Sequence, residues 1–140
     1  MLSAYPACFF KEGNQYSVIF PDLNNLSTKG DSLDDALVMA VDCLAGYLYL
    51  LEQDGGTAPK ATSMEKVNPS LVAKELKAAS DSSFVNMITV DVAAYAKMHF
   101  EKSVKKTLTI PAWLNTAALQ QNINFSQVLQ DALKEKLEVG

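Results

Sequence analysis

The chain of 140 residues contains no arginine, one histidine and two cysteines. So few histidines and cysteines cannot supply the four ligands of a structural zinc site, so we expect no metal. The first residues lack the basic segment of a secretory signal, which favours buried, reduced thiols at Cys8 and Cys43 over a disulfide. No apolar run approaches the roughly 20 residues that a membrane-spanning helix needs. We therefore expect a cytoplasmic protein with no membrane partner.

Hydrophobic residues make up 49% of the chain, enough for a folded core, and the net charge is −4. The charge is unevenly distributed. Residues 1–96 contain six lysines and twelve acidic residues, whereas residues 97–140 contain six lysines and four acidic residues. An acidic body followed by a mildly basic tail indicates two partners of opposite charge.

The first thirty residues have the pattern of a small antiparallel sheet. The apolar run from Leu2 to Lys11 predicts a buried strand, and the alternation over Tyr16–Phe20 predicts a second one. Residues 11–15, with a glycine and an asparagine at the centre, form the predicted hairpin connection. Leu26–Lys29 is predicted to form a short third strand that Gly30 ends.

A long amphipathic helix follows this predicted sheet. Asp31 or Ser32 can cap it, and Asp34 and Asp35 lie in its first turn, where the helix dipole favours negative charge. One apolar stripe at helical spacing contains Leu33, Ala36, Leu37, Ala40, Val41, Leu44, Leu48 and Leu51. Beyond it we expect a connector over residues 53–68, a short helix within 68–79, a strand over 84–90 and a helix over 91–100. The order predicts an α+β domain, and we place its end near residue 100.

The last forty residues show the order strand, helix, turn, helix. Val104–Ile110 alternates and predicts a strand, which Pro111 ends before a helix that reaches Asn122. Asn124 is predicted to stop that helix in a left-handed conformation, and Ser126 to cap the next one. The second helix carries the apolar residues Val128, Leu129, Ala132, Leu133 and Leu137.

One strand and two short helices cannot bury an apolar core alone, so residues 101–140 are predicted to dimerise. Pairing of the two strands would give an antiparallel ribbon, which fits the major groove of B-DNA. Three alternate side chains, Lys105, Thr107 and Thr109, would then face base edges. Lys102 would add charge, and Ser126 and Gln127 at a helix N-terminus would meet a phosphate. The predicted dimer core contains Leu108, Ile110, Trp113, Val128 and Leu129.

This C-terminal pattern resembles the ribbon-helix-helix repressors, through Lys105–Pro111 and the Asn124-Phe125-Ser126 start of the second helix. The N-terminal part is similar to the HicB antitoxin family. The matching motifs are Tyr5-Pro6-Ala7, the Tyr16–Leu23 segment with its Phe-Pro-Asp turn, the Gly30–Ala36 helix start, and Val90-Asp91-Val92 with Ala94-Tyr95. Their order and spacing together are more specific than any one of them.

The resemblance implies a type II antitoxin. Residues 1–100 would form a partial ribonuclease-H-like domain, with a three-stranded sheet, a helix and a further strand, that occludes a small basic HicA-like toxin that cleaves mRNA. Residues 101–140 would form a ribbon-helix-helix homodimer that binds operator DNA and represses the operon, within a dimer or a higher oligomer. Charge alone selects Asp22, Asp31, Asp34 and Asp35 as toxin-binding candidates.

Two alternatives remain open from the sequence. In the first, the chain is a stand-alone ligand-sensing repressor with no toxin partner. In the second, it is a metal-dependent nuclease, but Leu2–Phe10 contains no acidic residue where a ribonuclease-H-type site would need a carboxylate. His99 has no neighbouring nucleophile in any motif, which favours a surface histidine. We therefore expect no catalysis and no cofactor.

Overall fold

The computed structural model describes residues 1–138, which divide into two compact units. Unit 1 comprises Met1–Glu101, and unit 2 begins at Lys102. Each unit is described by itself.

Unit 1 begins with three consecutive antiparallel strands: β1 (Ser3–Glu12), β2 (Gln15–Phe20) and β3 (Leu26–Gly30). Gly13 adopts a φ of 63° in the β1–β2 turn, a conformation that costs glycine little. Between β2 and β3, Asn24 and Asn25 adopt φ values of 58° and 57°, which asparagine tolerates better than most residues. The predicted hairpin and third strand are confirmed.

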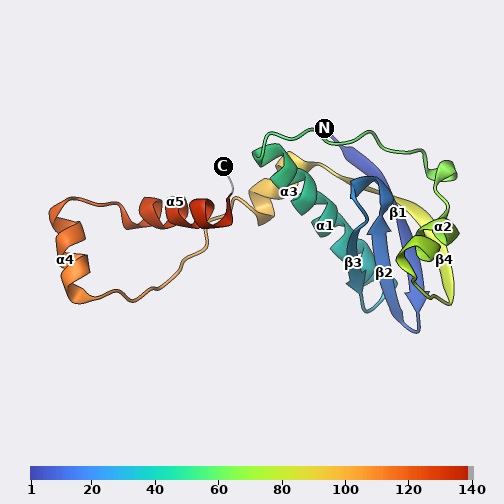
Figure 1. Cartoon of the computed structure of the whole chain (residues 1–140), viewed down its shortest axis with the longest axis horizontal. Helices are drawn as coiled ribbons and strands as arrows, with labels where there is room; N and C mark the ends of the chain where they lie inside the picture. Colours follow the sequence, from blue (N-terminus) through green and yellow to red (C-terminus); the bar gives the residue numbers. More distant parts are fainter. Residues whose placement is uncertain (139–140) are drawn as a thin grey trace. The chain divides into compact units, whose positions relative to one another are not determined.

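The fourth strand, β4 (Ser82–Val90), pairs with the opposite side of β1, so the sheet order is β3-β2-β1-β4 (Figure 1). All neighbouring strands are antiparallel. The described residues also form five α-helices, which confirms the predicted α+β class. The likeness to ribonuclease H stays a prediction.

One face of the sheet is covered by α1 (Leu33–Gln53). Ser32 is its N-cap, because the Ser32 hydroxyl accepts a hydrogen bond from the Asp35 N–H at 3.1 Å. The apolar stripe buries Ala36, Ala40, Leu44 and Leu48 against Phe9 and Phe20 of the sheet. A Cβ at Gly30 would lie 2.3 Å from the Ala36 nitrogen, so only glycine lets β3 approach the start of α1 this closely.

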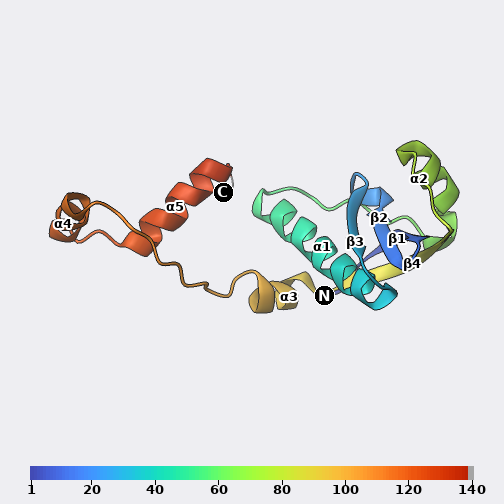
Figure 2. The same ribbon diagram turned by 90° about the horizontal axis from the view of Figure 1, so that it is seen from below.

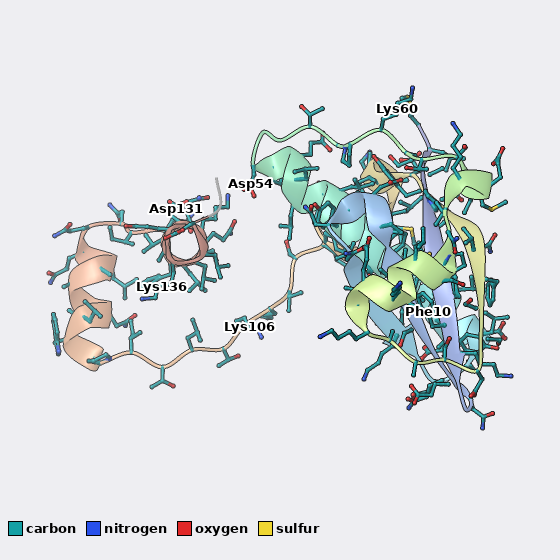
Figure 3. All side chains as sticks on the ribbon, turned by 45° about the vertical axis from the view of Figure 1, so that its right-hand side comes forward. Phe10, Asp54, Lys60, Lys106, Asp131 and Lys136 are labelled. Carbon is teal, nitrogen blue, oxygen red and sulfur yellow. The ribbon has the colours of Figure 1, made fainter. Side chains whose placement is uncertain are left out.

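The other face is partly covered by the short helix α2 (Pro69–Leu76), and Figure 2 shows α1 and α2 on opposite sides of the sheet. Val72 of α2 packs with Cys8, Phe10 and Ile19, and Figure 3 labels Phe10 close to α2. A connector, which includes a 3-10 turn at Met64–Lys66, links α1 to α2.

Hydrogen bonds hold this connector against the sheet. The Tyr5 hydroxyl donates to the Pro59 carbonyl. The Thr62 N–H and hydroxyl donate to the two oxygens of Asp22 at 2.8 and 2.7 Å. These contacts give residues 55–68, which lack a periodic sequence pattern, a defined path across the end of the sheet.

Helix α3 (Val92–His99) follows β4 and packs on α1. The Asp91 carboxylate caps it by accepting from the Ala94 N–H at 3.1 Å. The Tyr95 hydroxyl donates to Asp42 of α1 at 2.8 Å. His99 is exposed and stacks on the Tyr95 ring with 4.1 Å between ring centroids, consistent with a surface histidine.

Both cysteines are free thiols. Cys8 is fully buried in β1, and this burial raises the pKa of its thiol to about 11. Cys43 differs from the prediction because it is only half-buried, with its sulfur 3.9 Å from the Ser27 carbonyl.

Unit 2 contains α4 (Ala112–Gln120) and α5 (Phe125–Leu137), preceded by a segment without helix or strand. The predicted strand over Val104–Ile110 is not formed in the single chain. The physical reason is that a strand exists only in a hydrogen-bonded ladder, and the described residues provide this segment with no second strand.

The predicted turn between α4 and α5 was wrong in its details. The left-handed residue is Asn122, with a φ of 54°. Asn124 is extended and caps α5, because its side-chain oxygen accepts from the Gln127 N–H at 3.1 Å. Ser126 therefore lies inside the first turn of α5 rather than at its cap, since Asn124 has the three-residue spacing that a capping bond to Gln127 requires.

Candidate partner-binding surfaces

The negative charge of unit 1 is concentrated on α1 and the residues that flank it. Residues 31–54 contain six acidic residues and no lysine. Elsewhere in residues 1–96, six acidic residues balance six lysines. The net charge of −6 over residues 1–96 therefore belongs to one helix and its two ends, and Figure 3 labels Asp54 at the C-terminal end of that helix.

Apolar side chains are exposed among these carboxylates. Val38 and Leu50 are 65% and 54% exposed, although most apolar residues of α1 face the sheet. Helical spacing places Val38 and Met39 on the side of α1 that is turned away from the sheet and Leu50 at the border of that side. We define the α1 outer face as Asp35, Val38, Met39, Asp42 and Leu50, all of them exposed.

The four predicted toxin-binding residues do not form one group. Asp22 is half-buried, and both of its oxygens are occupied by Thr62 of the connector, so its role in the structure is to fix that segment. Asp31, Asp34 and Asp35 lie together at the N-terminal end of α1. The Asp35 carboxylate accepts from the Asp31 N–H at 2.9 Å, and Asp34 is exposed.

Sequence reasoning missed Asp42, Val38 and Leu50 as surface candidates. The signal was available for Val38 and Asp42, because these positions fall on the side of α1 opposite Ala40 and Leu44 when the helix is drawn at 100° per residue.

In residues 1–138, no three histidine, cysteine, aspartate or glutamate side chains converge in a group that could hold a metal ion. No helix in this range has the length and apolar character needed to cross a membrane.

In unit 2, the predicted DNA-binding residues are all exposed. Lys102, Lys105, Thr107 and Thr109 lie on the extended segment before α4, where Figure 3 labels the neighbouring Lys106. Ser126 and Gln127 lie in the first turn of α5, and the Gln127 side chain donates to Asp131 at 2.9 Å.

The predicted dimer core is largely uncovered in the single chain. Leu108, Ile110, Trp113 and Val128 are exposed, Trp113 to 71%, and Leu129 is half-buried. Residues 102–138 contain no buried residue at all. Leu108 and Ile110 line one side of an apolar groove, and Val128 and Leu129 of α5 line the other. Such a face needs a partner to become stable.

The fold and the two surfaces define a two-part binding protein: an acidic α+β unit with its own core, followed by a helical unit without one. The family model for HicB-like antitoxins of bacterial toxin-antitoxin systems matches residues 5–114. The chain therefore belongs to this antitoxin family.

Solved structures agree with the family assignment. The chain is 30% identical to a chain in a toxin-antitoxin complex from Streptococcus pneumoniae, with a TM-score of 0.67 and coverage of 97% of this chain and 99% of that one. It shares the fold of the antitoxin HicB of Burkholderia pseudomallei, at 21% identity and a TM-score of 0.51, with 96% of each chain covered. No curated protein matches the chain.

Proposed function

We propose that this antitoxin binds and blocks a HicA-like mRNA-cleaving toxin through unit 1 and represses its own operon through a ribbon-helix-helix dimer of unit 2. It acts in the cytoplasm, catalyses no reaction and needs no cofactor. The observation that carries the proposal is the contrast between the acidic α1 and the coreless unit 2. The similar chain from Streptococcus pneumoniae, found in a toxin-antitoxin complex, supports the toxin partner.

The α1 outer face is the surface that best fits a small basic partner. Complementary charge accelerates association and favours one relative orientation of the two proteins. The acidic excess of unit 1 lies on α1 and its two ends. Val38 and Leu50 supply the apolar area that a charged rim alone would lack. Asp31 and Asp34 extend this surface, whereas Asp22 is occupied by the connector.

Charge reversal on α1 tests this surface. We expect the pair Asp34→Lys and Glu52→Lys, both exposed on α1, to weaken binding of a catalytically inactive toxin at least tenfold, roughly 1.4 kcal/mol, mainly through a slower association rate. The control pair Glu65→Lys and Glu75→Lys makes the same change in net charge at exposed positions outside α1. Equal losses for the two pairs, measured by calorimetry and stopped flow, would contradict a docking surface on α1.

Dimerisation of unit 2 follows from its missing core. Pairing of two Val104–Ile110 segments would complete the ladder that a single chain cannot form. The partner segment would also cover the groove between Leu108, Ile110 and α5. In that ribbon, Lys105, Thr107 and Thr109 alternate with the apolar positions and so share the outer face.

DNA recognition can be tested without disturbing unit 1. Replacing Thr107 and Thr109 by alanine removes two hydroxyls from the outer face of the ribbon. We expect at least about a thirtyfold loss of operator affinity, since each lost base contact costs roughly 1–3 kcal/mol and two are lost, with toxin binding unchanged. Thr116→Ala on α4, whose hydroxyl donates to the Ala112 carbonyl, is the matched control. An unchanged operator affinity in the Thr107 and Thr109 variant would reject the ribbon.

A further inference from the structure

Lys106, labelled in Figure 3, stands on the apolar side of the extended segment that precedes α4. Side chains of an extended chain alternate between two sides, so Lys106 shares its side with Val104, Leu108 and Ile110. The structure agrees, since Lys106 lines the apolar groove of unit 2 together with Leu108, Ile110 and residues of α5. The proposed DNA-reading face and the proposed dimer core leave this lysine without a role.

The groove supplies Lys106 with no negative charge. Its other polar lining residues are Asn115 and Ser126, and none of its lining residues is acidic. The whole stretch of residues 102–130 contains no aspartate or glutamate. Asp131, the first carboxylate of α5, lies outside the groove lining and accepts a hydrogen bond from another α5 side chain at 2.9 Å. Among the described residues, Lys106 therefore has no ion-pair partner.

Dimerisation through the ribbon would bring no counter-charge to Lys106 either. In an antiparallel pair of Val104–Ile110 segments, a two-fold axis at the central residue, Thr107, places Lys106 opposite Leu108 of the partner subunit. Two ammonium groups per dimer would then be confined between apolar side chains. Removing a charge from water without a counter-charge is unfavourable, so Lys106 would weaken a dimer that has no DNA bound.

A DNA phosphate is the counter-charge that the proposed function provides. Lysine can lay its apolar stem along an apolar wall while its ammonium group stays at a polar edge. Ser126, which lines the same groove, is one of the residues expected to meet a phosphate. A phosphate at Ser126 would therefore border the groove that contains the Lys106 ammonium group.

We propose that Lys106 is a phosphate-binding residue that couples dimerisation of unit 2 to DNA binding. Without DNA, its charge keeps the dimer weak. With DNA bound, a phosphate neutralises that charge and stabilises the dimer, and by reciprocity the dimer binds DNA more tightly than the single chain does. The inference rests on the proposed ribbon-helix-helix dimer, and it adds a sequence-independent contact to the base contacts of the outer face.

Lys106→Met tests the coupling, because it removes the charge and keeps an unbranched side chain. Without DNA, analytical ultracentrifugation of the full chain should show self-association that is about tenfold tighter or more, since an apolar residue often stabilises a site where a charge was buried. The second measurement is binding of the dimer to a duplex of the region upstream of the chain's own reading frame, repeated over a range of salt concentrations. The slope of log affinity against log salt should become shallower by about 0.9 for each lost phosphate contact, or about 1.8 per dimer.

Lys105→Met is the matched control, because it removes the same charge from the adjacent residue on the outer face of the ribbon. It should leave self-association without DNA unchanged. Lys106→Arg keeps the charge at the inner position and should preserve both the self-association and the salt slope of the unmodified chain.

Unchanged or weaker self-association of Lys106→Met would overturn the inference, because the charge would then not oppose dimerisation. An unchanged salt slope in a variant that still dimerises and binds the duplex would overturn it as well. Both outcomes leave the proposed function intact. An unmodified chain that neither dimerises nor binds the duplex would overturn the inference together with the ribbon on which it rests.

Discussion

Helices α1 and α5 both carry an apolar stripe at helical spacing, but only the stripe of α1 is buried. Ala40 and Leu44 are inaccessible to solvent beneath the sheet of unit 1, whereas Val128 and Leu133 of α5 are more than half exposed. The difference lies in what each helix can reach within its own chain. Four strands give α1 a surface to cover, while α5 has only α4 and a single extended segment.

Unit 1 and unit 2 therefore differ in whether the single chain buries an apolar core. Unit 1 is folded by its own core, so a partner on the α1 outer face adds binding without being needed for the fold. Unit 2 lacks a core, so in the proposed dimer its stability would be linked to the concentration of the partner copy. Proteins of this second kind often have no stable folded monomer.

The largest expected effect comes from breaking the proposed dimer core. Leu108→Asp places a charge where two copies of unit 2 would meet, and burying an unpaired charge is strongly unfavourable. We expect operator affinity to fall by about a thousandfold, near 4 kcal/mol, together with loss of helical signal from α4 and α5. Toxin binding and the melting of unit 1 should not change. Retained operator binding would show that unit 2 functions without this core.

A cavity in the core of unit 1 should destabilise unit 1 and leave operator binding by unit 2 unchanged. Leu44→Ala removes a fully buried side chain, and such changes cost about 2–5 kcal/mol of the free energy of unfolding. We expect a lower denaturation midpoint for unit 1, with operator binding preserved at temperatures where unit 1 remains folded. Val38→Ala on the exposed side of the same helix is the control and should leave the midpoint nearly unchanged. A matching loss in both variants would argue against the assigned core.

The sequence predicted unit 1 well because its elements are specified locally. Gly13 and the Asn24–Asn25 pair marked the reversals, and the α1 stripe has an uninterrupted helical period. The path of residues 55–68 was not predictable, because it depends on long-range bonds from Tyr5 and Asp22. Asn124 and Ser126 are both good capping residues, so only the fold could select Asn124.

The toxin-binding candidates were less predictable than the fold. Charge and capping patterns identified Asp31, Asp34 and Asp35 near the start of α1, but charge alone could not separate Asp22, which holds Thr62, from carboxylates that are available to a partner. The DNA-binding positions and the dimer core stay predictions, since a single chain cannot show a ribbon that two chains build.

A smaller expected effect is a difference in alkylation rate between the two thiols of unit 1, Cys8 and Cys43. Burial raises the pKa of Cys8 to about 11, and it also raises the pKa of the half-buried Cys43, with a further contribution from Asp42. Thiolate is the reactive form, so at pH 8 we expect slow alkylation of Cys43 and none of Cys8 until unit 1 unfolds. Mass spectrometry of Cys8→Ser and Cys43→Ser variants measures each rate. Equal rates in the folded protein would contradict the packing of β1.

The smallest expected effect concerns Asp91. The Ala94 N–H and then the amino group of Met1 hold the pKa of the Asp91 carboxyl below its ordinary value. Because the folded-state pKa is lowered, the charge of Asp91 stabilises unit 1 at neutral pH, and this contribution is lost as the pH falls through the folded-state pKa. Asp91→Asn keeps a capping side chain but removes the charge. Its melting temperature should lie slightly below that of the unmodified chain at pH 7, and the two should converge as the pH falls below the folded-state pKa of Asp91.

Co-purification tests the central claim most directly. The tagged full chain is expressed together with the small basic reading frame adjacent to it, and both the eluted complex and its effect on cell growth are measured. We predict a stoichiometric complex whose small partner is toxic when expressed alone. Elution of the tagged chain alone, still bound to its operator, would contradict the antitoxin function and favour a repressor that senses a small ligand.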